Sequence, residues 1–182
     1  MKTRALLLVL VGTALLCGCA FTQPRYARED GRPIDWGLEG AVSESVTVLA
    51  FTAPDERYGV YAAKRLKEEL LNVAAFQRVV YGAGEPVDTR YIVRGEITDL
   101  YYGGTNAATR VSLNLRVSDR ADGQTRYLRK FTVRYAVKGF SLQWLNRYYA
   151  PAPLPEEVLS GLMKEVAEEL AERTASNEKQ CK

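Results

Sequence analysis

The sequence contains no histidine, and cysteine accounts for only three of its 182 residues. Without histidine, Ser-His-Asp and Cys-His catalysis and the commonest metal ligand are excluded. The chain also lacks the G-x-S-x-G, Walker and G-x-G-x-x-G patterns of hydrolases and nucleotide-binding proteins. We therefore expect a protein that is not an enzyme, with no catalytic residues and no metal site.

Carboxylates alone could still perform acid-base chemistry on a glycan. Glu96 and Asp99 are the closest pair within a predicted strand. Their odd separation would place them on opposite faces of that strand. A glycosidase needs two carboxylates about 5–10 Å apart in one cleft, and no such pair is expected here.

A strong excess of charge is also missing. The chain carries 25 Lys and Arg against 22 Asp and Glu, a formal net charge of +3. A dedicated nucleic-acid-binding domain is usually much more basic. No nucleic-acid partner is expected.

Long apolar runs are absent after the first 16 residues. Residues 5–16 are apolar, Gly or Thr, and they follow the basic residues Lys2 and Arg4. The run is shorter than the roughly 20 residues of a membrane-spanning helix. A basic head followed by a short apolar core predicts a secretory signal peptide over residues 1–18.

The end of this signal, Leu16-Cys17-Gly18-Cys19, resembles the lipobox of bacterial lipoproteins. Cys17 does not fit the pattern because bulky leucines precede it. The resemblance implies cleavage after Gly18 and a diacylglycerol on Cys19, a covalent lipid and not a cofactor. Acyl chains contribute about 0.8 kcal/mol per buried methylene, so several chains form a stable anchor. A plain secreted protein is the alternative.

The residue after the lipobox cysteine bears on location. Ala20 stands where Asp is linked with inner-membrane retention in enteric bacteria. The resemblance therefore implies the inner leaflet of the outer membrane, facing the periplasm. Cys181 would be the remaining thiol, so a disulfide within the mature monomer is excluded and a bridge between chains stays open.

Turn residues and hydrophobic periodicity divide the mature chain. Residues 19–42, rich in Pro and Gly, are predicted to be a lipidated N-terminus and tether. Residues 43–174 are predicted to be one periplasmic domain, and residues 175–182 a frayed tail. Apolar patterns predict strands at 46–51, 76–81, 91–101, 111–119 and 125–137, with helices at 56–72 and from 155 onward.

This order, β-α-β-β-β-β-α, predicts an α+β fold. An early β-α-β crossover followed by antiparallel strands favours a single mixed or antiparallel sheet of about five strands. Both helices are expected to pack on one face of the sheet.

Four segments carry a family resemblance: VTVLAF (46–51), FQRVV (76–80), YIVRGEITDL (91–100) and VSLNLRVSDRADGQ (111–124). Together with the lipobox they resemble a group of small periplasmic lipoproteins. The group includes the N-terminal domain of the Tol-Pal B protein, the curli-secretion lipoprotein, the Pel exopolysaccharide-export lipoproteins (PelC-type) and lipoprotein activators of peptidoglycan synthases. The resemblance implies this fold and an accessory role in the envelope.

The segment between the last predicted strand and the last helix is rich in large apolar side chains. They are Phe140, Trp144, Leu145, Tyr148 and Tyr149. Trp and Tyr are common at membrane interfaces and binding hot spots. We interpret this predicted loop as a surface for membrane or partner; the alternative is a cap on the core.

Charge is distributed unevenly between the last two predicted strands and the last helix. The strands contain Arg116, Arg126, Arg129 and Arg134, whereas the helix contains Glu165, Glu168, Glu169 and Glu172. Opposite charges could join copies head to tail, closing a ring if the rotation allows. The alternative is that both surfaces are simply solvated.

The leading hypothesis is a lipid-anchored accessory of the outer membrane in envelope export or assembly, with exopolysaccharide secretion favoured. Its expected partners are outer-membrane lipid, further copies of itself and/or another envelope protein. The alternative is a monomeric regulatory or auxiliary lipoprotein for a cell-wall synthase or an ABC-type lipid-transport system.

Overall fold

The computed structural model describes residues 26–84, 87–105, 107–135, 138–142 and 146–175. Gly18 and Cys19 lie outside these residues, as do Trp144, Leu145 and the tail from 176 onward. Where the chain is described, no helix is both long and apolar enough to cross a membrane.

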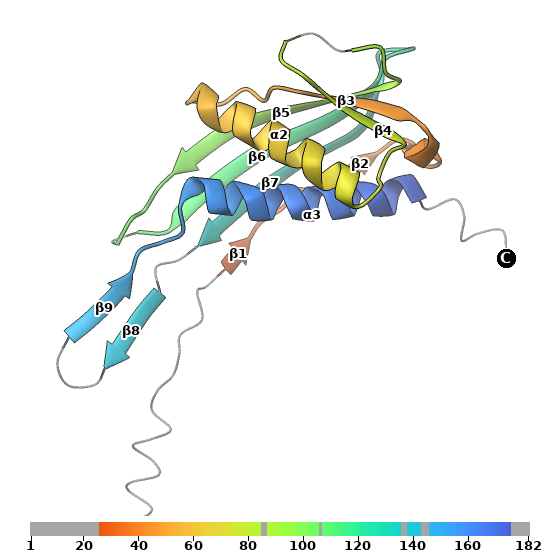
Figure 1. Cartoon of the computed structure of the whole chain (residues 1–182). Helices are drawn as coiled ribbons and strands as arrows, with labels where there is room; N and C mark the ends of the chain where they lie inside the picture. The colour runs from red at the N-terminus through yellow and green to blue at the C-terminus, as the bar shows by residue number, and fades with distance from the viewer. Residues whose placement is uncertain (1–25, 85–86, 106, 136–137, 143–145, 176–182) are drawn as a thin grey trace, which may run out of the picture.

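The protein is a two-layer α+β structure (Figure 1). Helices α2 and α3 lie side by side on one face of a mixed sheet, and no helix of the described residues covers the other face. The elements are β1 (Tyr26–Arg28), β2 (Ile34–Asp35), η1 (Ala41–Ser43), β3 (Ser45–Leu49), α2 (Glu56–Asn72), β4 (Arg78–Gly82), β5 (Tyr91–Tyr101), β6 (Thr109–Asp119), β7 (Thr125–Tyr135), β8 (Lys138–Leu142), β9 (Asn146–Ala150) and α3 (Pro155–Ala175).

In the described part of the chain the main sheet has seven strands, in the order β1-β7-β6-β5-β3-β4, with β2 also paired to β7. Strand β3 is parallel to β4 and β5, whereas β5, β6 and β7 are antiparallel. The predicted α+β class and two helices on one face are confirmed. The predicted count of about five strands is too low.

The additional strands come from the predicted tether. Strands β1 and β2 both pair with β7, and the backbone N–H groups of Glu29 and Gly31 between them donate hydrogen bonds to the same strand. Leu38, which follows, is fully buried. Residues 26–43 therefore belong to the folded domain. A short segment rich in Gly and Pro can still form hydrogen bonds with the backbone groups at the exposed edge of a sheet.

Helix α2 forms where the sequence analysis predicts it. Asp55 caps its N-terminus by accepting a 3.1 Å hydrogen bond from the Arg57 N–H. Ala62, Leu66 and Leu70 form a fully buried stripe toward the sheet. The helix approaches the β3–α2 connection very closely at Gly59, where an added Cβ would lie 2.1 Å from the Phe51 carbonyl oxygen.

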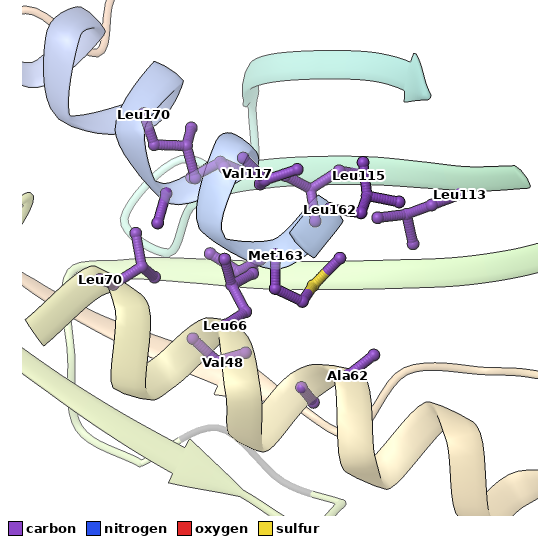
Figure 2. Packing of buried hydrophobic residues seen from close by; sticks show 14 of the residues in the cluster. Val48, Ala62, Leu66, Leu70, Leu113, Leu115, Val117, Leu162, Met163 and Leu170 are labelled. Atoms are coloured by element: carbon purple, nitrogen blue, oxygen red, sulfur yellow. The ribbon is translucent and has the colours of Figure 1, made fainter. Parts of the chain in front are cut away.

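The hydrophobic core lies between the helices and the sheet. Figure 2 shows Leu66 and Leu70 of α2 and Leu162, Met163 and Leu170 of α3 facing apolar side chains of the strands. From the sheet come Val48, Leu113, Leu115 and Val117. The period-two alternation of β6 therefore directs one row of side chains into the core and the other onto the open face.

A β-bulge changes the predicted side of one carboxylate. The register of β5 on β6 shifts between Ile97 and Asp99. Glu96 is then opposite Asn114, and Asp99 is opposite Ser112, two residues of β6 that share a face. The prediction that Glu96 and Asp99 lie on opposite faces is wrong, because a bulge inserts one extra residue into the alternation.

The predicted aromatic loop contains a β-hairpin. Strands β8 and β9 pair with each other, and Phe140 lies opposite Tyr148 while Gly139 lies opposite Tyr149. The hairpin projects beyond the sheet and α3 (Figure 1). It follows directly from β7, whose last residue, Tyr135, pairs with Tyr26 at the start of β1. The hairpin and the start of β1 thus lie at the same end of the molecule.

Candidate functional site

The helix-covered face of the sheet carries a buried ionic cluster at its β7 edge. The Arg129 guanidinium binds the Glu169 carboxylate, and these side chains are only 18% and 14% exposed. The Tyr127 hydroxyl, fully buried, donates a 2.9 Å hydrogen bond to the same carboxylate. Asp30, from the connection between β1 and β2, also lies 3.2 Å from Arg129. The cluster joins β7, α3 and the N-terminal segment.

Two further ion pairs join the N-terminal segment to α3. Arg28 binds Glu165, and Arg173 lies 3.3 Å from Asp35. Arg129, Glu165 and Glu169 were predicted to form charged surfaces between copies, but the structure shows that they bind partners inside the molecule. Glu168 and Glu172 remain exposed on α3.

The environment of Tyr127 predicts a pH dependence of stability. Burial, reinforced by the Glu169 carboxylate, raises the pKa of the Tyr127 hydroxyl well above its ordinary value. Its contribution is therefore complete below pH ~10 and is lost as the pH rises from there toward the folded-state pKa, because the unfolded chain releases the proton first. Tyr127→Phe should lower the free energy of unfolding by about 1 kcal/mol at pH 7, through loss of one hydrogen bond.

Urea denaturation of both proteins between pH 7 and 11.5 measures this effect. The difference between wild type and Tyr127→Phe, about 1 kcal/mol at pH 7, should fall above pH 10 by up to about 1.4 kcal/mol per pH unit and should change sign within roughly one pH unit. The other tyrosines titrate equally in both proteins and cancel. A difference that stays constant across this range would contradict the raised pKa.

Arg126 is also bound within the molecule, at the turn between β6 and β7. Its guanidinium lies 3.3 Å from Asp119, and Arg90 lies 3.2 Å from the same carboxylate. Burial of Asp119 raises the pKa of its carboxyl, but the Ala121 backbone N–H and these two guanidinium groups outweigh burial and hold the pKa below its ordinary value. The carboxylate is therefore a structural centre of the turn.

The open face of the sheet is hollowed into a groove of about 660 Å³. We call it the open-face groove. Its lining residues include Arg32, Ile34, Thr52, Arg94, Glu96, Asn114, Arg116, Leu128 and Lys130. They come from the N-terminal segment, the β3–α2 connection and strands β5, β6 and β7, so only the folded register brings them together.

The groove is basic. Of its five basic lining residues, Arg129 is paired with Glu169, and the other four are not neutralised. Arg94 of β5 lies directly opposite Arg116 of β6. Lys130 of β7 and Arg32 are exposed beside them. Within the described residues, none of these four side chains forms an ion pair or a hydrogen bond, and the one carboxylate in the lining, Glu96, accepts a 3.4 Å hydrogen bond from Asn114.

The sequence analysis identified Arg116 but missed the groove. Arg94, Lys130 and Arg32 are ordinary surface residues in a linear sequence, and only strand register places them together. Arg134 is exposed on β7, as a charged surface requires, and lies outside the groove lining. In the parts of the chain that the structure describes, no group of His, Cys, Asp and Glu could hold a metal ion.

No protein-family model and no curated protein sequence matches the chain. Solved structures do match. A PelC dodecamer from Paraburkholderia phytofirmans is 16% identical, with a TM-score of 0.59 over 81% of this chain and 99% of that chain. A variant of the same PelC, also a dodecamer, has a TM-score of 0.60 at 16% identity over 81% of this chain and 98% of its own.

A DUF330 protein from Xanthomonas campestris is similar over 71% of this chain and 84% of its own, with a TM-score of 0.52 at 13% identity. The chain therefore has a fold of the PelC-type lipoproteins.

Proposed function

We propose that the chain is a lipid-anchored, non-enzymatic accessory of the outer membrane that assists exopolysaccharide export as an oligomer. One observation carries the proposal: the fold matches almost the whole length of a protein solved as a PelC dodecamer. Pel-type lipoproteins serve exopolysaccharide export, and the predicted lipobox at Cys19 is consistent with an anchored member of this group.

Exposed charges offer a means of self-association. Glu168 and Glu172 lie one helical turn apart on α3, in the helix layer. Arg134 lies on β7 with its side chain exposed. Because unlike charges on different surfaces of one molecule favour heterologous contact, copies could join head to tail and close a ring.

The end of the molecule that carries β1 offers a membrane-facing surface. The β8–β9 hairpin contains Phe140, Tyr148 and Tyr149, and it projects where β1 begins, closest in sequence to Cys19. A lipid on Cys19 would bring this end to the bilayer. We propose that the hairpin, with Trp144 and Leu145, contacts the membrane or a partner there.

Light scattering of residues 20–182 at 50 mM and 500 mM NaCl tests self-association. We expect a discrete oligomer at low salt that dissociates at high salt, because screening weakens contacts between exposed charges. The double variant Glu168→Lys, Glu172→Lys should be monomeric at both salts. Glu29→Lys, Glu39→Lys makes the same charge change at exposed sites outside α3 and should still assemble.

A wild-type monomer at both salts and at high protein concentration would contradict unaided self-association. The second candidate function is that of a monomeric regulatory lipoprotein, and one observation favours it. Arg129, Glu165 and Glu169 are bound internally, which leaves less charge for contacts between copies. In that case the hairpin would be the docking surface for a different envelope protein.

A further inference from the structure

We propose that the open-face groove binds a saccharide that carries an oxyanion, either a carboxylate or a phosphate on a sugar ring. The inference deepens the proposed function and rests on it for the choice of a sugar. The preference for an anion rests on the groove alone. Neither the similarity to PelC nor the exposed charges of α3 and β7 assign a ligand to the open face of the sheet.

The first argument is the arginine pair. Arg94 and Arg116 are direct cross-strand neighbours on β5 and β6, a position in which like charges destabilise a sheet. No acidic side chain among the described residues binds either of them. An anion placed between the two guanidinium groups would remove this repulsion and accept charge-assisted hydrogen bonds from both.

The second argument is the order of the side chains across the groove, with basic residues at one end and apolar residues at the other. Leu128 lies opposite Arg116 on β7, and Ile34 lies opposite Leu128, so one row across the sheet reads Arg94, Arg116, Leu128, Ile34. Lys130 is in the adjacent row, next to Asn114. An oxyanion at the arginine end of the groove would leave an apolar surface beside it for the rest of the ligand.

The third argument is the chemistry of that remaining surface. Leu128 and Ile34 can contact the C–H face of a sugar ring. Asn114, Glu96 and Thr52 provide an amide, a carboxylate and a hydroxyl on the other side of the groove for ring hydroxyls. The volume of about 660 Å³ lies within the range of small-ligand sites. A short acidic saccharide therefore satisfies both parts of the groove.

Titration calorimetry on residues 20–182 tests the proposal with three probes: an alginate hexasaccharide, glucose 1-phosphate and neutral maltohexaose. We expect binding of at least one anionic probe and none of maltohexaose. Tighter binding of the alginate hexasaccharide would identify an acidic polysaccharide as the source of the ligand. Tighter binding of glucose 1-phosphate would identify a phosphorylated glycan.

Variants locate the site. Arg94→Gln, Arg116→Gln should weaken binding of the anionic probe at least about tenfold, because two charge-assisted contacts are lost. Glu96→Gln should strengthen it severalfold by removing the one carboxylate. Arg78→Gln, which removes one exposed cation of β4 outside the groove, should leave affinity unchanged. Thermal unfolding should show that the double variant is at least as stable as wild type, since the repulsive pair is gone.

Three outcomes would overturn the inference. Equal affinity for maltohexaose and the anionic probes would exclude charge recognition, and an equal loss in Arg78→Gln would indicate non-specific attraction. The third outcome is that the wild type binds no saccharide and the double variant Arg94→Gln, Arg116→Gln has a different oligomeric mass from the wild type. The groove would then be a contact between copies. A wild-type monomer that binds the saccharide would contradict the proposed self-association but support saccharide binding in the open-face groove. The two proposals can therefore fail separately.

Discussion

A chain that starts at residue 44 should lose at least about 3 kcal/mol of its free energy of unfolding and should aggregate, although the deleted segment was predicted to be a tether. The deletion removes fully buried Leu38, worth about 1.5–3 kcal/mol alone. It also removes Asp30 and Arg28, which bind Arg129 and Glu165. The remaining charges would then lack these partners.

The deletion also exposes the outer edge of β7. In the intact molecule, residues 26–36 pair with that strand along most of its length. An uncovered edge of this length is a template for pairing between molecules. Urea denaturation and light scattering of chains starting at residues 26 and 44 measure both effects. Equal stability of the two chains would show that the N-terminal strands do not contribute to the domain.

Glu169→Ala should cost about 2–3 kcal/mol of stability, a large effect for one side chain at a helix–sheet boundary. The carboxylate is the shared acceptor of the Tyr127 hydroxyl and the Arg129 guanidinium. Its loss leaves a fully buried hydroxyl without this acceptor. Arg129 keeps the contacts with Asp30 at 3.2 Å and the Gly31 carbonyl at 3.1 Å, and its position over the Phe131 ring, but loses its carboxylate partner on α3.

The neighbouring residue supplies a matched control. Glu168 is exposed on the same helix, so Glu168→Ala should change stability by less than about 0.5 kcal/mol. Glu169→Gln should fall between the two, because an amide can accept from Tyr127 but does not neutralise Arg129. Chemical denaturation at pH 7 distinguishes the three. Similar costs at 168 and 169 would show that the cluster does not stabilise the fold.

Long periodic segments were predictable from the sequence. Helix α2 (Glu56–Asn72) and strand β5 (Tyr91–Tyr101) have the predicted bounds, because their apolar residues recur with the periods of a helix and a buried strand. Strands β1 and β2 were not predictable. They have three and two residues, and pairing with β7 rather than any local pattern determines them.

The site was less predictable than the fold, because it depends on register. Pairing Arg94 with Arg116 requires the alignment of β5 on β6, and the side of Asp99 depends on a bulge that the linear alternation does not reveal. The opposite-charge surfaces were visible in the sequence, but the Arg129–Glu169 contact inside the molecule was not. Composition shows which charges exist, and only packing shows which are already neutralised.

The early start of the fold would limit how far a molecule lipidated at Cys19 can extend from a membrane. Six residues lie between Cys19 and Tyr26, where β1 begins, and the seven Cα-to-Cα steps from Cys19 to Tyr26 span at most roughly 25 Å when fully extended. The predicted tether, ending at residue 42, would have reached roughly three times as far. The folded domain of a protein lipidated at Cys19 would thus stay close to the bilayer, so its partners would have to bind it near the bilayer surface.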